Sequence, residues 1–158
     1  MKIKGVVFDW AGTAVDFGCV SPVSAFREAF RRAGIDVTEE EVRAPMGLLK
    51  LDHIRTMLAM PRIAALWTEK YGSAPTHAER IYADFEPALM SVLPRHCDLI
   101  PGILQTCEYL RAKEIRIGST TGFTNAMMDV VREGAAQGGY APDCLQTADL
   151  NGGFGRPW

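Results

Sequence analysis

The sequence lacks the features that mark membrane-spanning, secreted and nucleic-acid-binding proteins. Its 158 residues carry a net charge of −2 and no cluster of lysine or arginine, so we expect no nucleic-acid partner. No apolar run approaches the ~18 residues of a membrane span. The first run is broken by Asp9 before it reaches the length of a signal peptide. These absences predict a cytoplasmic protein with no membrane partner.

The cysteines are dispersed, and their pattern does not suit a metal site. The four cysteines include no Cys-x-x-Cys pair, which argues against zinc and for reduced thiols: Cys19, Cys97, Cys107 and Cys144. Hydrophobic residues make up 47% of the chain and charged residues 23%, as in an ordinary globular protein that buries one core. The composition therefore predicts a single domain with room for a small insertion.

The rest of the chain is organised around the first apolar run. Gly5-Val6-Val7-Phe8 has the character of a strand and breaks off at Asp9, before Gly12 and Thr13. In open α/β folds, ligands bind at the carboxyl ends of the strands. Gly12 allows a tight turn in which its amide, neighbouring amides and the Thr13 hydroxyl face an anion. The pattern favours a nucleophilic carboxylate beside a phosphate site, and the alternative is a buried strand with Asp9 as a cap.

Helical patterns fill the segment from Asp16 to about Asp98. Ser21-Pro22 opens a helix that Gly34 ends, and Thr38-Glu39-Glu40-Glu41 has the form of a capping box. Further helical patterns cover Leu48 to Met60, Ile63 to Tyr71, and Thr76 to about Leu93. We expect no strand here, so the segment is predicted to be an all-helical insertion.

Strand and helix patterns alternate after Ile100. The predicted order is a helix to about Lys113, a strand at Ile115–Ser119, a helix from about Asn125 to Ala136, and a strand at Cys144–Thr147. With the first strand, this order predicts an α/β fold with a parallel, Rossmann-like sheet core, incomplete at three strands, and an inserted α-helical cap domain. The predicted core comprises residues 1–18 and 98–158, and the predicted cap comprises residues 19–97.

The cap carries a sharp chemical signal. On a helix, Met46, Lys50, His53 and Met57 share one stripe at steps of three and four, beside an apolar stripe. Lys50 would then lie against buried surface, where desolvation and a neighbouring cation favour the neutral amine that adds to a carbonyl. The alternative is a lysine whose stem packs on the core while its ammonium reaches water, with His53 as a structural residue.

Two further segments are candidates for binding phosphoryl oxygens. Ser119-Thr120-Thr121-Gly122 follows a predicted strand, so a hydroxyl and nearby amides there are suited to a second oxygen. Gly155-Arg156-Pro157 would bring a guanidinium suited to bidentate phosphate contact to the same edge. Taken alone, the first segment is also compatible with a plain turn and the second with a solvated loop arginine.

The first motif resembles that of a known superfamily. Val6 to Asp16 is similar to the first motif of the haloacid dehalogenase superfamily, whose nucleophilic aspartate is followed two residues later by an aspartate that acts as general acid and base. Ala11 stands at that second position here. An oxygen leaving group needs a proton, and loss of the acid lowers the rate by roughly 10²–10⁴. Ala11 therefore disfavours the alternative enzyme, a phosphatase or phosphomutase of this superfamily.

The motifs together resemble those of the phosphonoacetaldehyde hydrolase (phosphonatase) family, from about residue 3 to the last residue. They are Asp9-x-Ala11-Gly12-Thr13, Met46-Gly47-x-x-Lys50-x-x-His53, Ser119-Thr120-Thr121-Gly122 and Gly155-Arg156-Pro157. The resemblance implies hydrolysis of the C–P bond of phosphonoacetaldehyde to acetaldehyde and phosphate, in the degradation of 2-aminoethylphosphonate. It implies that Asp9 is the nucleophile, that Lys50 forms a Schiff base with the substrate, and that Mg²⁺ is held by the Asp9 side chain and the Ala11 carbonyl.

The resemblance also implies roles for the other candidates. Three residues would line the pocket and assist proton movement: Met46, His53 and Cys19. Six would bind substrate: Gly12, Thr13, Gly47, Ser119, Thr120 and Arg156. An iminium delocalises the carbanion left by C–P cleavage as an enamine, which explains why no acid is needed at residue 11. The resemblance further implies a homodimer formed through the cap.

Two departures from the family pattern are present. Phe123 stands where a tyrosine is expected after the second motif. Family members also continue past the Arg-Pro segment into a helix, a strand and a pair of acidic residues that complete the metal site. We therefore expect a C-terminally truncated chain with low activity and a tendency to associate through an open sheet edge. A non-catalytic remnant that binds a ligand or partner without turnover is a further alternative.

Overall fold

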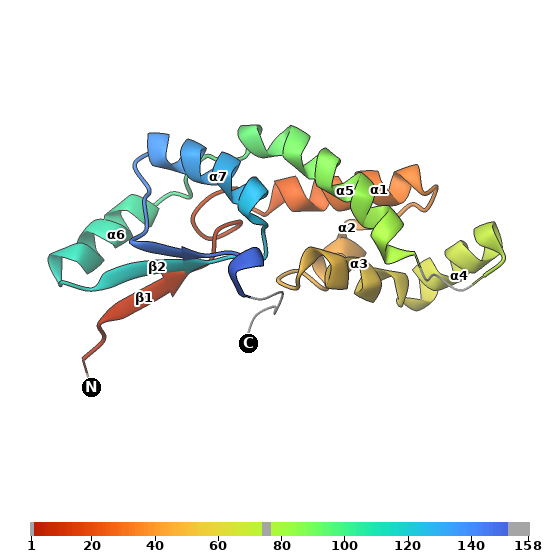
Figure 1. Cartoon of the computed structure of the whole chain (residues 1–158), viewed down its shortest axis with the longest axis horizontal. Coiled ribbons are helices and arrows are strands. Elements are labelled where there is room, and N and C mark those ends of the chain that lie inside the picture. The colour runs from red at the N-terminus through yellow and green to blue at the C-terminus, as the bar shows by residue number, and fades with distance from the viewer. Residues whose placement is uncertain (1, 74–76, 152–158) are drawn as a thin grey trace. The chain divides into compact units, whose positions relative to one another are not determined.

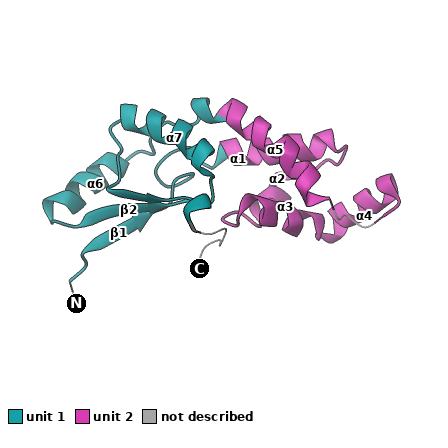
Figure 2. Ribbon diagram, in the orientation of Figure 1, with its two compact units in different colours: residues 1–20, 93–155 teal, residues 21–92, 156–158 magenta. Residues whose placement is uncertain are grey.

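A computed structural model describes residues 2–73 and 77–151 of the chain (Figure 1). These residues form two compact units (Figure 2). The first, here the sheet unit, comprises residues 2–20 and 93–151, and the second, the helical unit, comprises residues 21–73 and 77–92. The boundaries expected from the sequence fall after residues 18 and 97, and those of the two units fall after residues 20 and 92.

The sheet unit is built on three parallel strands. β1 (Gly5–Phe8), β2 (Arg116–Thr120) and β3 (Cys144–Gln146) lie side by side in that order (Figure 1). Phe8 pairs with Ser119, and Thr120 pairs with Gln146, so the carboxyl ends of the strands meet at one edge. Helix α6 (Ile103–Ala112) precedes β2 and α7 (Asn125–Gln137) precedes β3. The predicted α/β fold with an incomplete parallel sheet is confirmed.

An apolar stripe along α7 forms much of the core of this unit. Met127, Met128, Val131 and Ala135 recur at helical spacing and are all buried. The helix begins where the Thr124 hydroxyl accepts a hydrogen bond from the Met127 amide (3.4 Å). Two short 3₁₀ helices, η1 (Leu93–Arg95) and η2 (Asp149–Asn151), complete the elements of the unit.

The helical unit contains five α-helices among its described residues. They are α1 (Val20–Arg32, from its second residue on), α2 (Glu39–Arg43), α3 (Lys50–Leu58), α4 (Pro61–Tyr71) and α5 (Ala78–Val92). The capping box at α2 is present: the Thr38 hydroxyl accepts from the Glu41 amide (3.2 Å) and the Glu41 carboxylate accepts from the Thr38 amide (2.8 Å). No strand occurs in residues 20–73 or 77–95, which confirms the expected helical insertion over these residues.

Aromatic rings of α1 and α5 hold the interior of the helical unit. Phe26 and Phe30 of α1 and Phe85 of α5 are fully buried, and the rings of Phe26 and Phe85 are stacked with centroids 4.2 Å apart. Burial of such side chains is worth roughly 1.5–3 kcal/mol each before entropy is counted. These contacts fix α1 against α5.

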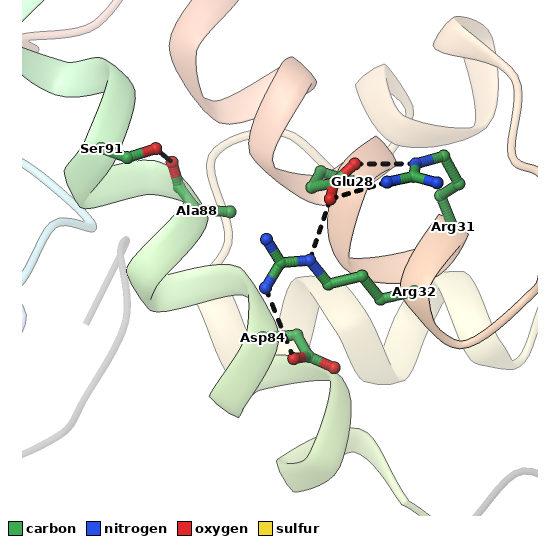
Figure 3. A network of polar contacts seen from close by, with 6 residues as sticks. All are labelled: Glu28, Arg31, Arg32, Asp84, Ala88 and Ser91. Atoms are coloured by element: carbon green, nitrogen blue, oxygen red, sulfur yellow. Dashed lines mark hydrogen bonds and ion pairs between the residues drawn. The ribbon is translucent and has the colours of Figure 1, made fainter.

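A surface network connects the same two helices (Figure 3). Glu28 accepts hydrogen bonds from Arg31 (2.8 Å) and Arg32 (2.9 Å), and Arg32 lies 3.7 Å from the carboxylate of Asp84 on α5. The hydrogen bond from Arg31, followed by that from Arg32, lowers the pKa of Glu28 to about 2. Because these side chains are exposed, we assign the network a minor part in stability compared with the rings beneath it.

Among the described residues, no helix is long and apolar enough to cross a membrane.

Candidate active site

The segment after β1 is a compact turn that closes on its own backbone. Asp9 follows the strand and is partly buried, and the next carbonyl, that of Trp10, accepts hydrogen bonds from three successive amides, Thr13 to Val15 (2.8–3.1 Å). The Gly12 amide donates to the Val15 carbonyl (2.8 Å). The amides of Gly12 and Thr13 are therefore already bonded, and the expectation that they face an anion is wrong for this structure. The exposed Thr13 side chain stays a candidate.

Cys19 packs against the same turn. Its thiol donates a hydrogen bond to the Ala11 carbonyl (3.0 Å). A Cβ added at Gly12 would lie 2.5 Å from the Cys19 sulfur, and Gly12 has a φ of +82°, so any larger residue would push the thiol aside and strain the turn. The structure thus brings together three residues that the sequence placed in the site: Ala11, Gly12 and Cys19.

Asp16 anchors this loop and was not predicted as a site residue. It is buried and has a φ of +55°, a conformation that aspartate tolerates better than most residues. Its carboxylate accepts a hydrogen bond from the Val20 amide at the start of α1 (3.0 Å), and its amide donates to the Asp98 carbonyl (3.2 Å). The Nδ1 atom of His96 lies 3.4 Å from the same carboxylate oxygen. The signal in the sequence was an aspartate shortly before a helix, where its short side chain can accept a hydrogen bond from an amide of the first turn.

The end of β2 lies next to the end of β1. Since Phe8 pairs with Ser119, Asp9 and Thr120 follow at the same edge of the sheet. Ser119 is buried, and its hydroxyl donates to the Cys144 carbonyl of β3 (3.2 Å), which gives it a structural role. The Thr121 hydroxyl accepts from the Phe123 amide (3.1 Å). Of the three hydroxyls, the half-buried Thr120 is the one best suited to a ligand.

The segment before α3 differs from the expected helical stripe. Met46 lies in a turn, and α3 begins at Lys50, so Met46 does not share a helix with Lys50 and His53. Gly47 has a φ of +102° with nothing within 4 Å of an added Cβ, so the backbone conformation, and not crowding, requires glycine. The helix interpretation failed because this glycine conformation ends the preceding turn.

Lys50 and His53 are both buried in the helical unit. Lys50 is 8% exposed, with its Nζ 5.8 Å from the centroid of the Phe26 ring. His53 is fully buried one turn along α3 and stacks on Phe26 with centroids 3.9 Å apart. Neither ring nitrogen of His53 has a hydrogen-bond partner among the described residues. Lys50 is therefore beside buried surface, as expected from the sequence.

The environment of His53 keeps its imidazole neutral. Burial is the largest effect and the nearby positive charge of Lys50 the second, and together they lower the pKa of His53 from 6.5 to about 4. The backbone of Val42 raises it by a smaller amount. At neutral pH, His53 is an uncharged ring next to a lysine, with nitrogens able to accept a proton.

A metal would have few protein ligands in the described part of the chain. No group of three or more His, Cys, Asp or Glu side chains suited to a metal ion occurs there. The Asp9 carboxylate and the Ala11 carbonyl are two hard oxygen donors. The Ala11 carbonyl accepts a hydrogen bond from the Cys19 thiol, which is a weak donor. Mg²⁺ is usually held by one or two carboxylates with water and substrate oxygens, so this pair fits it. Arg156, the last predicted site residue, lies outside the described residues.

Comparison with solved structures defines the class of the fold. No family model matches the chain. A haloacid dehalogenase-like hydrolase from Bacteroides fragilis is 16% identical, and the match covers 94% of this chain and 65% of the hydrolase chain. Its TM-score of 0.70 supports the fold alone. A phosphonoacetaldehyde hydrolase-like protein from Oleispira antarctica is 38% identical over 93% of this chain and 54% of its own, with a TM-score of 0.89. The chain has the fold of the haloacid dehalogenase superfamily.

Curated relatives define the match more narrowly. The phosphonoacetaldehyde hydrolase of Bacillus cytotoxicus is 48% identical over the whole of this chain. The bifunctional phosphonoacetaldehyde hydrolase/aminoethylphosphonate transaminase of Clostridioides difficile is 50% identical over 99% of it. These matches confirm the resemblance to the phosphonoacetaldehyde hydrolases along the full chain. The chain spans 61% of the length of the first relative and 25% of the second.

Proposed function

We propose that this protein hydrolyses the C–P bond of phosphonoacetaldehyde to acetaldehyde and phosphate. The observation that carries the proposal is the buried Lys50 beside a neutral His53, a pairing suited to Schiff-base chemistry. Relatives that carry the name of this activity are about half identical to the chain. Ala11 agrees with the proposal because a carbanion leaving group stabilised by an iminium needs no acid at that position.

The proposed reaction begins at Lys50. The amine adds to the substrate aldehyde, and His53 accepts the proton released from nitrogen and returns it to the carbinolamine oxygen. A further proton from solvent lets that oxygen leave as water, which gives the protonated imine. The Asp9 carboxylate then attacks phosphorus. The C–P bond breaks, its electron pair moves into the iminium to give an enamine, and phosphate is left bound to Asp9. The reaction requires Asp9 and Lys50 to act on the same substrate molecule.

Two hydrolyses complete the cycle. The enamine takes up a proton on carbon, and water cleaves the resulting imine to release acetaldehyde and free Lys50. Water also cleaves the acyl phosphate on Asp9, which releases phosphate and restores the carboxylate. The Thr120 hydroxyl, at the same sheet edge as Asp9, is the proposed donor to a phosphonyl oxygen during these steps. We propose the same role for Arg156.

Magnesium completes the proposal. The Asp9 carboxylate and the Ala11 carbonyl would hold Mg²⁺, which when bound neutralises charge on the phosphonyl oxygens. The Cys19 thiol, which donates to the Ala11 carbonyl, would orient that oxygen before binding. A homodimer formed through the helical unit and a cytoplasmic location are parts of the same proposal, and sedimentation equilibrium measures the first directly.

Borohydride trapping tests the proposed chemistry at its first step. We expect sodium borohydride with phosphonoacetaldehyde to leave a reduced adduct on Lys50, located by peptide mass spectrometry. We expect no adduct on Lys70, an exposed lysine that donates a hydrogen bond to the Gly34 carbonyl. Lys50→Arg removes the adduct, whereas Asp9→Asn keeps it and stops phosphate release. A chain that releases phosphate without an adduct on Lys50 would rule out the imine and favour the phosphatase alternative.

A further inference from the structure

Three helices of the helical unit meet at the ring of Phe26. The ring, on α1, is fully buried and stacks on the imidazole of His53 from α3, with centroids 3.9 Å apart and planes at 18°. It also stacks on Phe85 from α5, with centroids 4.2 Å apart and planes at 24°. The Nζ atom of Lys50 lies 5.8 Å from the centroid of the same ring, within the range of a cation–π contact.

Within the described residues, neither ring nitrogen of His53 makes a hydrogen bond. A buried histidine is ordinarily held by a bond to one ring nitrogen, which also sets the tautomer, but both nitrogens of His53 lack a partner among the described residues. The contact that defines the plane of the imidazole is its parallel stack on Phe26. Lys50 lies one turn before His53 on α3, and its positive charge lowers the pKa of His53. The amine and the imidazole that would accept its proton are therefore neighbours.

We propose that Phe26 is the positioning residue of this site: its ring holds the His53 imidazole in one orientation beside Lys50, so that a ring nitrogen can take the proton from the amine. Phe26 itself carries no group that gives or takes a proton. A flat face is required because a branched aliphatic side chain fills the volume but does not define the plane of a ring stacked at 3.9 Å. The catalytic meaning of this inference rests on the proposed function, and the orientation of His53 does not.

Phe30 provides a matched control. It lies one turn further along α1 and is equally buried, and Phe26 is the residue stacked on His53. Phe26→Leu and Phe30→Leu therefore remove a buried ring from the same helix, and only the first removes the stack. Phe26→Met is a second variant of similar volume, to be used with the first so that the result does not depend on one variant folding well.

Two measurements on the whole chain test the inference. The first is the NMR titration of the His53 ring. We expect His53 to titrate at higher pH in Phe26→Leu and Phe26→Met than in the wild type, and at the wild-type pH in Phe30→Leu, since a ring without the stack can turn toward water. The second is the rate of borohydride adduct formation on Lys50, which we expect to fall about 10-fold in the two Phe26 variants, since proton transfer contributes 10²–10⁴ to such steps.

The two proposals fail in different ways. An unchanged His53 titration and adduct rate in both Phe26 variants would overturn the positioning role and leave the imine intact. An equal change in Phe30→Leu would also overturn it, because the effect would then be one of general packing. If the wild type forms no adduct, the proposed function fails, while the His53 titration still decides whether Phe26 orients the ring.

Discussion

Replacing His53 by leucine is expected to make the chain more stable, and more so in acid. His53 is fully buried with two unpaired nitrogens, and a buried polar group without a partner costs about 1–3 kcal/mol. Leucine removes this cost and loses the stack on Phe26, worth about 0.5–1.5 kcal/mol. We therefore expect the free energy of unfolding of His53→Leu to exceed that of the wild type by about 1 kcal/mol at pH 7.5.

The advantage grows as the pH falls. Burial and then Lys50 lower the pKa of His53 from 6.5 to about 4 in the folded chain. Between these values the unfolded chain binds a proton at His53 and the folded chain does not, so this residue lowers wild-type stability as the pH drops through the window. The loss is complete near pH 4 and amounts to at most about 3 kcal/mol, at 1.36 kcal/mol per pH unit.

Urea denaturation followed by circular dichroism measures both effects. Unfolding free energies of wild type and His53→Leu are compared at pH 7.5, 6 and 5, so that titrations common to both proteins cancel. His77→Gln, which removes an exposed imidazole, serves as the control. A His53→Leu chain that is less stable than the wild type at every pH, with the same pH slope, would show that His53 is bonded and titrates normally.

Three further predictions concern the elements around the site. Asp16→Ala removes the acceptor for the Val20 amide and places alanine at a φ of +55°. We expect urea denaturation to show that the free energy of unfolding falls by about 1–3 kcal/mol, and by less than about 1 kcal/mol in Asp16→Asn. Equal losses in the two variants would contradict this. Thr38→Ala breaks the capping box of α2 and should lower the unfolding free energy by about 1 kcal/mol, and an unchanged value would mean that the cap is formed only weakly in solution. Val7 is 67% exposed on β1, so Val7→Lys should reduce self-association in sedimentation velocity; unchanged association would exclude this strand as the contact.

Much of the local structure could be predicted because its causes are local. The apolar spacing on α1, the Thr38 capping box and the break at Gly34 each act within one or two turns of the chain, and the helices lie where these signals place them. The alternation of strand and helix after Ile100 likewise predicted the parallel sheet. Asp9 and Thr120 could be placed at one edge from topology alone.

The errors lie where backbone geometry or distant residues decide. A stripe from Met46 to His53 assumes a helix, and the φ of +102° at Gly47 cannot be read from spacing. The Gly12 amide was expected to be available for an anion, but the turn bonds it to a carbonyl three residues away. The stack of Phe26 on His53 joins positions 27 residues apart, and no sequence pattern indicates such a contact.

The central claim is that Lys50 and Asp9 together cleave a C–P bond, and the products of turnover test it most directly. Phosphonoacetaldehyde is incubated with the chain and Mg²⁺, and acetaldehyde and phosphate are each measured over time, with the Bacillus cytotoxicus hydrolase as positive control. Even at a low rate, we expect the two products in equal amounts, and neither from Lys50→Arg or Asp9→Asn. Phosphate without acetaldehyde, undiminished turnover by Lys50→Arg, or no turnover by the wild type would contradict the account.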